Sequence, residues 1–168
     1  LSQRVQSLTR SAEGGWQVDG QAFDRVILAC SAAEAARLTT SLSAPLAPAW
    51  SAQAAALHYQ PIITVYLQHP GPAWPAPMLA LQEGPQAPAQ FAFDLGQLSA
   101  EAAGRSAWVI SGAAPWVERG LDAAAEAVRQ QAQQELGWTE APTLIRVLAE
   151  KRATFACTPG LQRPPAAI

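Results

Sequence analysis

Pro61-Ile62-Ile63-Thr64-Val65-Tyr66-Leu67-Gln68 is the strongest strand signal in the chain. Its residues are mainly β-branched or aromatic, which is typical of a strand that packs in a sheet. Further strands are predicted along the chain at residues 78–81, 90–94 and 107–111, and a separate final strand is predicted at residues 143–148. We therefore expect an antiparallel sheet of about four strands, flanked by helices, within an α/β (α+β) fold.

The clearest predicted helix is Leu121–Leu136, because apolar residues recur there at helical spacing. Gly137 follows at the position where a glycine commonly ends a helix. Shorter helices are expected at Ala32–Leu38, with Ser31 as the N-cap, and at Ala49–Leu57. The apolar stripe of the long helix is Leu121, Ala125, Val128, Ala132 and Leu136.

The first thirty residues read as three strands, at Arg4–Leu8, Trp16–Val18 and Phe23–Cys30. Asp19-Gly20 is a strong turn signal between the second and the third. The end of the third strand, Val26–Cys30, is a continuous apolar run. Such a run indicates burial on both faces, as in a parallel or mixed sheet.

The composition allows one domain with a sizeable core and limits its partners. The chain has 168 residues, of which 49% are apolar and only 14% are charged, against about 25% charged in a typical soluble domain. A net charge of −2 without a basic patch makes nucleic acid a poor partner. The low charge indicates that part of the surface is covered, either by other parts of the protein or by a membrane. No apolar run is long enough to span a bilayer.

The cysteines and histidines show no motif for catalysis or metal binding. Cys30 and Cys157 are far apart, with no CxxC pair and no Cys/His cluster, so no metal site is expected. Both are interpreted as reduced intracellular thiols, with Cys157 buried and inert in preference to reactive. His58 and His69 are interpreted as capping or surface residues in preference to catalytic ones.

Among the six tryptophans, Trp16 and Trp108 lie in predicted strands and are expected in the core. Trp74 lies in a proline-rich segment, where a core or loop anchor is favoured over a ligand contact. Neither GxGxxG nor GxxxxGK[ST] occurs, so the chain has no nucleotide-phosphate loop of its own. These patterns alone therefore define an α/β chain with an antiparallel sheet and an apolar loop.

The stretch after the last predicted strand is unusual. It reads Glu150-Lys151-Arg152-Ala153-Thr154-Phe155-Ala156-Cys157-Thr158-Pro159-Gly160-Leu161-Gln162-Arg163-Pro164. Adjacent cations, an aromatic residue, a thiol and a Pro-Gly break make it too irregular for a core segment, and we expect a loop around Arg152.

Four earlier segments carry a family resemblance: Val5-x-x-Leu8, Gly15-Trp16-x-Val18, Phe23–Ala29 and Ala35–Leu38. Together they resemble the middle of the flavin-containing amine oxidase and phytoene desaturase superfamily. The Arg152 stretch is similar to its squalene-associated branch, the FAD-dependent hydroxysqualene dehydroxylases of hopanoid synthesis. The resemblance implies three parts: a partial FAD-binding domain (1–44), a substrate-binding domain (45–150) and a return toward the FAD domain (151–168).

The resemblance also implies site residues. Val5 matches a valine whose backbone contacts the adenine of FAD in the family. Ala29, Cys30 and Ser31 match the family's Ala-x-Pro beside the cofactor, with Ser31 standing in place of proline. Phe155 and Arg152 belong to the segment expected to approach the flavin, with Arg152 a catalytic candidate.

On this resemblance, the chain is the central part of an FAD-dependent oxidoreductase acting on an apolar isoprenoid such as hydroxysqualene. The remaining FAD-domain segments are expected before Leu1 and after Ile168, so the chain alone is expected to lack FAD and activity. A cytoplasmic location is expected, with peripheral contact with the inner membrane. Two alternatives stay open: a general flavin amine oxidase, or a cofactor-free module that binds lipid or a protein partner.

Overall fold

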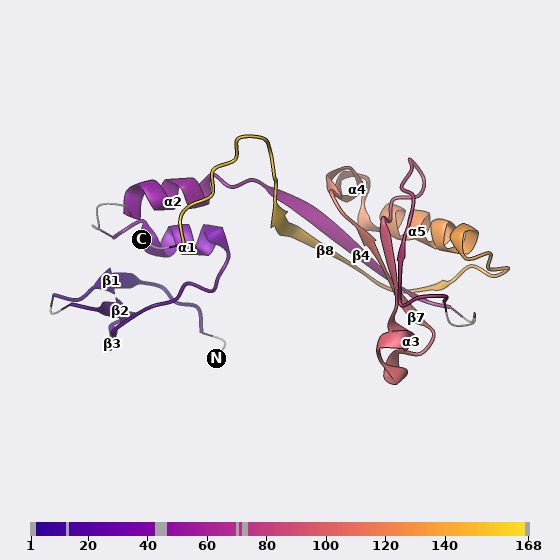
Figure 1. Cartoon of the computed structure of the whole chain (residues 1–168), viewed down its shortest axis with the longest axis horizontal. Coiled ribbons are helices and arrows are strands. Elements are labelled where there is room, and N and C mark those ends of the chain that lie inside the picture. Colours follow the sequence, from indigo (N-terminus) through magenta and orange to yellow (C-terminus); the bar gives the residue numbers. More distant parts are fainter. Residues whose placement is uncertain (1–2, 13, 43–46, 70, 72–73, 167–168) are drawn as a thin grey trace. The chain divides into compact units, whose positions relative to one another are not determined.

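A computed structural model describes residues 3–12, 14–42, 47–69, 71 and 74–166 (Figure 1). The chain divides into two compact units. Unit 1 comprises Leu1–His58 and Ala156–Ile168, and unit 2 comprises Tyr59–Phe155. The domain bounds expected from the resemblance (1–44, 45–150 and 151–168) differ from these limits, and they stay a prediction for the whole protein.

Unit 1 contains a three-stranded antiparallel sheet and two helices. The strands are β1 (Leu8–Arg10), β2 (Trp16–Val18) and β3 (Gln21–Phe23), in the order β1-β2-β3. Asp19 and Gly20 form the two-residue turn between β2 and β3, and both have positive φ angles, of 50° and 85°. This is the backbone that a tight hairpin requires, so the turn prediction is confirmed.

The helices of unit 1 are α1 (Ala32–Thr39) and α2 (Ala47–Ala55). The side chain of Ser31 accepts a hydrogen bond from the backbone of Glu34 (3.4 Å), which confirms Ser31 as the N-cap of α1. A small core joins the sheet to α1 and α2. Its buried members are Leu8, Leu38, Leu42 and Ala47.

Two strand predictions in unit 1 are wrong. Of Arg4–Leu8 only Leu8 lies in a strand, and the strand predicted at Phe23–Cys30 ends at Phe23. A strand needs a hydrogen-bonding neighbour, and no described residue pairs with 24–30. Ile27 is 91% exposed, so the expected burial on both faces is absent from this unit. All pairings within the described residues are antiparallel, with no parallel or mixed sheet.

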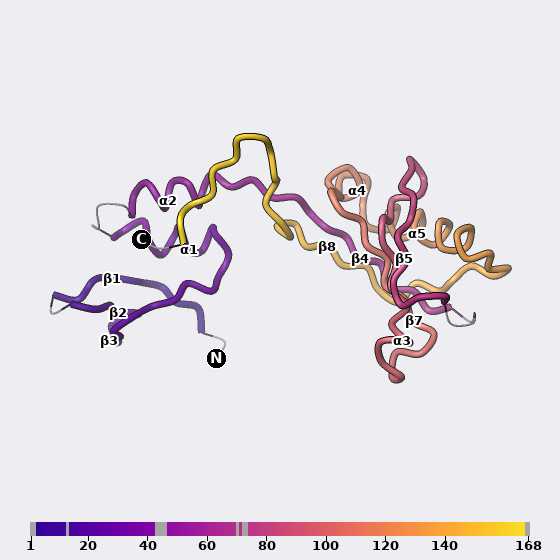
Figure 2. Tube along the Cα trace, viewed as in Figure 1, coloured from indigo at the N-terminus to yellow at the C-terminus, as the bar shows by residue number. Residues whose placement is uncertain are grey.

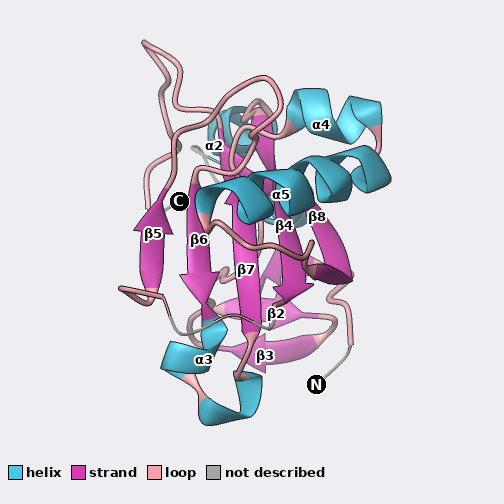
Figure 3. Ribbon diagram, turned by 90° about the vertical axis from the view of Figure 1, so that its right-hand side faces the viewer, coloured by secondary structure: helices cyan, strands magenta, loops and turns pink. Residues whose placement is uncertain are grey.

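Unit 2 is a five-stranded antiparallel sheet in the order β5-β6-β7-β4-β8, with the long helix Leu121–Glu135 across one side (Figure 3). The last predicted strand joins this sheet as a fifth member. The strands are β4 (Tyr59–Gln68), β5 (Met78–Ala80), β6 (Phe91–Asp94), β7 (Arg105–Ile110) and β8 (Thr143–Phe155). The helices are α3 (Leu95–Leu98), a 3-10 turn (Ala100–Ala102), α4 (Ala114–Arg119), which the sequence did not predict, and α5 (Leu121–Glu135).

Strands β4 and β8 run side by side along most of their length (Figure 2). Because β8 continues to Phe155, the loop expected around Arg152 is wrong, and Arg152 lies within a strand. The pairing shifts register between Gln60 and Ile62. Pro61 lies at this shift, and proline has no N–H to donate to a neighbouring strand.

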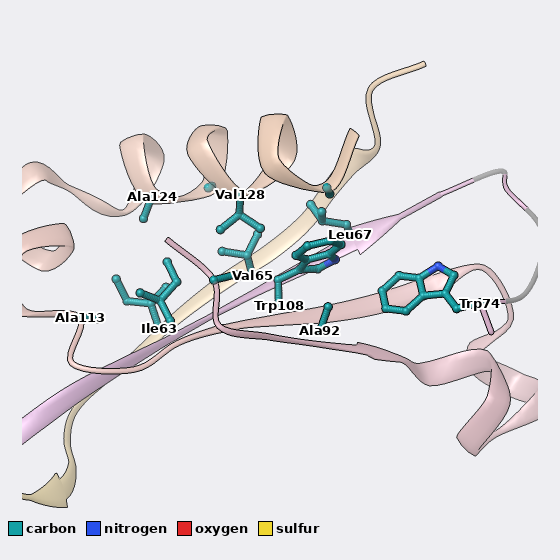
Figure 4. Close-up of a cluster of buried hydrophobic side chains, with 13 residues drawn as sticks. Ile63, Val65, Leu67, Trp74, Ala92, Trp108, Ala113, Ala124 and Val128 are labelled. Atoms are coloured by element: carbon teal, nitrogen blue, oxygen red, sulfur yellow. The ribbon is translucent and has the colours of Figure 1, made fainter. Parts of the chain in front are cut away.

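The core of unit 2 lies between the sheet and α5 (Figure 4). Ile63, Val65 and Leu67 of β4 point toward Val128 of α5, and all four side chains are fully buried. Trp108 of β7 is also fully buried, and its indole N–H donates to the hydroxyl of Ser106 (3.0 Å). The expected core position of Trp108 and the apolar stripe of α5 are therefore confirmed.

Candidate functional site

The side of the unit 2 sheet away from α5 is largely apolar. Side chains alternate along a strand, so Ile62, Thr64 and Tyr66 point away from the core that holds Ile63 and Val65. The strand register extends this side across the sheet, since directly paired residues share a face. We call it the open face; its larger apolar members are Ile62, Tyr66, Met78, Phe91, Phe93, Val109 and Leu148.

Several of these side chains are exposed. Met78 is 50% exposed, Phe91 39% and Leu148 38%. Isolated apolar residues on a surface need no explanation, but a contiguous apolar patch marks a binding or contact surface. The open face is therefore the part of unit 2 best suited to hold an apolar molecule.

At one end of the open face lies a hollow of about 310 Å³. Tyr66 and Arg146 line it from the paired strands β4 and β8, and Arg105 lines it from β7. Its remaining lining is apolar, from Leu95, Ala102, Ile145 and Leu148. We call this feature the arginine hollow, since two guanidinium groups border an otherwise apolar space.

Unit 1 contains a cavity of about 590 Å³. Val5, Ala29 and Cys30, three of the residues expected near the cofactor, all line it. Arg4 and Arg37 are also part of its wall, together with apolar side chains from the sheet and from residues 26–28. Ser31 is not among its lining residues; its side chain caps α1 instead.

Arg37 fixes the segment that carries Val5. Its guanidinium donates to the carbonyl oxygens of Val5 (2.6 Å) and Gln6 (3.1 Å) and to the carboxylate of Glu34 (2.9 Å). The hydrogen bond from Arg37, with a second from Arg4, lowers the pKa of Glu34 below its usual range. The carbonyl of Val5 is thus already engaged within unit 1, so its expected backbone contact with adenine would use its N–H or share the carbonyl.

Arg152 and Phe155 lie on β8 in unit 2. The backbone N–H of Arg152 donates to the carboxylate of Glu150 (3.0 Å). No carboxylate of a described residue forms an ion pair with the Arg152 guanidinium. Phe155 is half-buried and pairs with Tyr59 at the end of the sheet. The roles of both residues toward a flavin stay predictions.

An aromatic cluster surrounds His69 in unit 2, and no sequence pattern indicated it. His69 is only 4% exposed, so its expected surface position is wrong. Its ring stacks on Trp138, with centroids 4.7 Å apart, and lies 5.8 Å from the ring of Trp74. Neither ring nitrogen of His69 has a hydrogen-bond partner among the described residues. Burial lowers the pKa of His69 by more than the nearby Asp94 carboxylate raises it.

The remaining sequence expectations concern thiols and metals. Cys157 is exposed, so its expected burial is wrong, and Cys30 is exposed as well. His58 is exposed, just after α2. The described residues contain no group of three or more His, Cys, Asp or Glu side chains placed to hold a metal ion.

The family model described as flavin containing amine oxidoreductase matches residues 1–138, which is most of the chain. The chain therefore belongs to this family of flavin-dependent proteins.

A solved structure supports the same fold. It is a putative protoporphyrinogen oxidase from Exiguobacterium sp. 255-15, similar with a TM-score of 0.59 and 15% sequence identity. The match covers 93% of this chain and 36% of that protein, so the chain spans about a third of its length. No curated protein matches the sequence. In the part of the chain that the structure describes, no helix has the length and hydropathy of a membrane span.

Proposed function

We propose that the protein is an FAD-dependent oxidoreductase acting on an apolar isoprenoid such as hydroxysqualene, and that this chain forms mainly its substrate-binding part. The observation that supports this most directly is the open face of unit 2. Family membership supports flavin chemistry, and the similarity of the Arg152 stretch to the squalene-associated branch supports the choice of substrate.

A hydrocarbon substrate matches the open face chemically. An isoprenoid chain has almost no hydrogen-bonding groups, so its binding energy comes from burial of apolar area, at about 25 cal/mol per Å². Phe91, Phe93 and Met78 on β6 and β5 offer broad, uncharged contacts of this kind. A charged amine would be favoured by a nearby carboxylate, and the carboxylate of Glu150 on this face lies opposite Ile62 on the edge strand β8, several strands away from Met78 and Phe93.

Part of FAD would lie in the unit 1 cavity. Its apolar wall, formed by residues such as Val5 and Leu28, fits a flat aromatic ring, and Arg4 and Arg37 supply cationic groups beside it. FAD, when bound, supplies the redox chemistry of the reaction. The residues of this chain would bind and orient the cofactor and the substrate and exclude water. Val5, Ala29 and Cys30 are the proposed contacts, and Arg152 is the proposed positive charge near the reacting group.

A second candidate is a module that binds lipid without a cofactor, since the open face would suit this function equally. We favour the enzyme because the family match covers the segments of unit 1 as well as unit 2. A cytoplasmic enzyme in peripheral contact with the inner membrane would have access to such a substrate, and this location is part of the proposal.

The test is the visible spectrum of the full-length protein, recorded without oxygen before and after addition of hydroxysqualene. We expect flavin absorbance that bleaches or shifts when hydroxysqualene is added. Flavin bands that respond to an amine and not to hydroxysqualene would support a general amine oxidase instead. A colourless protein that FAD does not reconstitute would contradict the enzyme and leave the lipid-binding module.

A further inference from the structure

We infer that the arginine hollow binds the anionic head, a carboxylate or a phosphate, of a small amphipathic molecule whose hydrocarbon part lies on the open face. This inference goes beyond the proposed reaction, because hydroxysqualene carries no charged group. It concerns binding alone, and it does not depend on a bound flavin.

The strand register places the two arginines on either side of β4. Arg105 pairs with Gln68 from β7, and Arg146 pairs with Tyr66 from β8. Neighbouring strands are about 4.8 Å apart and residues about 3.4 Å apart along a strand, so the two Cα atoms are about 10 Å apart across β4 and about 7 Å along it. Two long side chains that start at this separation and line one hollow can both reach a single anion above Tyr66.

The charge of the hollow is not neutralised within unit 2. Neither guanidinium forms an ion pair with a carboxylate of a described residue, whereas Arg4, Arg37 and Arg129 all do. Arginine donates two parallel hydrogen bonds to a carboxylate or phosphate, which makes it the preferred residue for such groups. An anion is therefore the complementary occupant of the space between Arg105 and Arg146.

The apolar residues that line the arginine hollow indicate what the ligand carries besides its anionic head. Leu95, Ile145 and Leu148 border the hollow, and Leu148 continues into the open face beside Thr64. A bare inorganic anion would leave these apolar walls uncovered, whereas a hydrocarbon chain attached to the head would cover them. The hollow is therefore suited to an amphiphile and not to a free ion.

The experiment measures binding of decyl phosphate and of decanoate to the protein by calorimetry, at concentrations where both are monomeric. Decanol and inorganic phosphate test the two halves of the ligand separately. We expect both anionic amphiphiles to bind at least about tenfold more tightly than decanol or inorganic phosphate, and increasingly weakly as salt is raised. Equal affinity for decyl phosphate and decanol would overturn the inference.

Variants locate the site. Arg105→Gln and Arg146→Gln should each weaken binding of decyl phosphate about tenfold, and both side chains are exposed, so the fold should persist. Arg25→Gln is the matched control: Arg25 is exposed in unit 1, outside every site described above, and its loss should change nothing. Equal effects of all three variants would show a general charge effect and overturn the site.

Vesicles separate a small ligand from a membrane surface. Phosphatidylglycerol and phosphatidylcholine vesicles are compared with the monomeric amphiphiles. Binding of decyl phosphate that depends on Arg105 and Arg146 in the absence of vesicles supports the inference. Binding to phosphatidylglycerol vesicles alone, with no affinity for monomeric decyl phosphate, would assign the two arginines to a membrane contact and overturn it.

Discussion

Replacement of Gln131 by leucine should destabilise unit 2 although it keeps nearly the same volume. Gln131 lies on α5 and is only 1% exposed, and its amide makes two hydrogen bonds with the backbone of Ala89. The N–H of Ala89 donates to the side-chain oxygen (2.8 Å), and the side-chain nitrogen donates to the carbonyl of Ala89 (2.9 Å). The side chain of Gln131 thereby satisfies both backbone groups of Ala89, which is fully buried and lies two residues before the start of β6.

The magnitude follows from these two bonds. Each buried backbone group left without a partner costs about 1–3 kcal/mol. The apolar leucine offsets about 1.5 kcal/mol of this loss through burial. For the two groups together, the net loss lies between about 0.5 and 4.5 kcal/mol, and we expect Gln131→Leu to lower the free energy of unfolding by about 2.5 kcal/mol, the middle of this range. With a urea dependence of about 2 kcal/mol per M, the unfolding midpoint should fall by roughly 1 M.

The assay is urea unfolding followed by tryptophan fluorescence, together with hydrogen exchange of the Ala89 amide. Gln134→Leu is the control, because Gln134 is exposed on the same helix and the same chemical change there should leave the midpoint nearly unaltered. An unchanged midpoint for Gln131→Leu, with slow exchange at Ala89 retained, would refute the reasoning.

Three further predictions concern His69, the open face and Arg152. Burial lowers the pKa of His69, so this residue binds a proton more readily in the unfolded chain than in the folded one. The contribution of neutral His69 to stability should be fully present above a pH of about 6.5. It should be lost as the pH falls from there toward the lower pKa that His69 has in the folded state. Thermal unfolding of His69→Phe, measured across this pH range, should lack the pH dependence that His69 contributes. An unaltered pH profile in this variant would mean that other groups cause the dependence. In the full-length protein, Phe91→Asp should weaken binding of hydroxysqualene about tenfold or more, since a charge would replace an apolar contact, and an unchanged dissociation constant would exclude the open face as its site. Arg152→Ala should reduce turnover of the full-length enzyme without loss of fold, and full activity would remove Arg152 from the proposed mechanism.

Much of unit 2 follows from local sequence. The stripe on α5 and the glycine after it predict a helix that the structure confirms to within one residue, because helix amphipathicity and end signals are local properties. Strand β4 is equally clear from its β-branched residues. Local patterns do not reveal Gln131, since its partner Ala89 is 42 residues away and a glutamine on a helix is ordinarily exposed.

Predictions that depended on a partner strand were less successful. Val26–Cys30 is apolar enough for a buried strand, yet apolarity specifies burial and not which neighbour supplies the hydrogen bonds. In β8 the error was the opposite one: the adjacent cations Lys151 and Arg152 favoured a loop in the sequence, where the structure has a strand. Pairing with the long strand β4 extends β8 through both residues as far as Phe155. Tertiary pairing thus outweighs local composition in both segments.

The arginine hollow shows why the candidate site could not be read from the sequence. Arg105 and Arg146 lie on either side of β4 only because the sheet order is β7-β4-β8. This spatial order differs from the order of the strands in the sequence. A second condition is the register shift in β8: Leu67 pairs with Leu144 and Tyr66 with Arg146, so Ile145 is an extra residue. Strict alternation would place residues 144 and 146 on the same face. The extra residue lets Leu144 lie opposite Leu67, which faces the core, while Arg146 lies opposite Tyr66 on the open face. Without this bulge the two arginines would not share one face, and the anion site inferred from them would not exist.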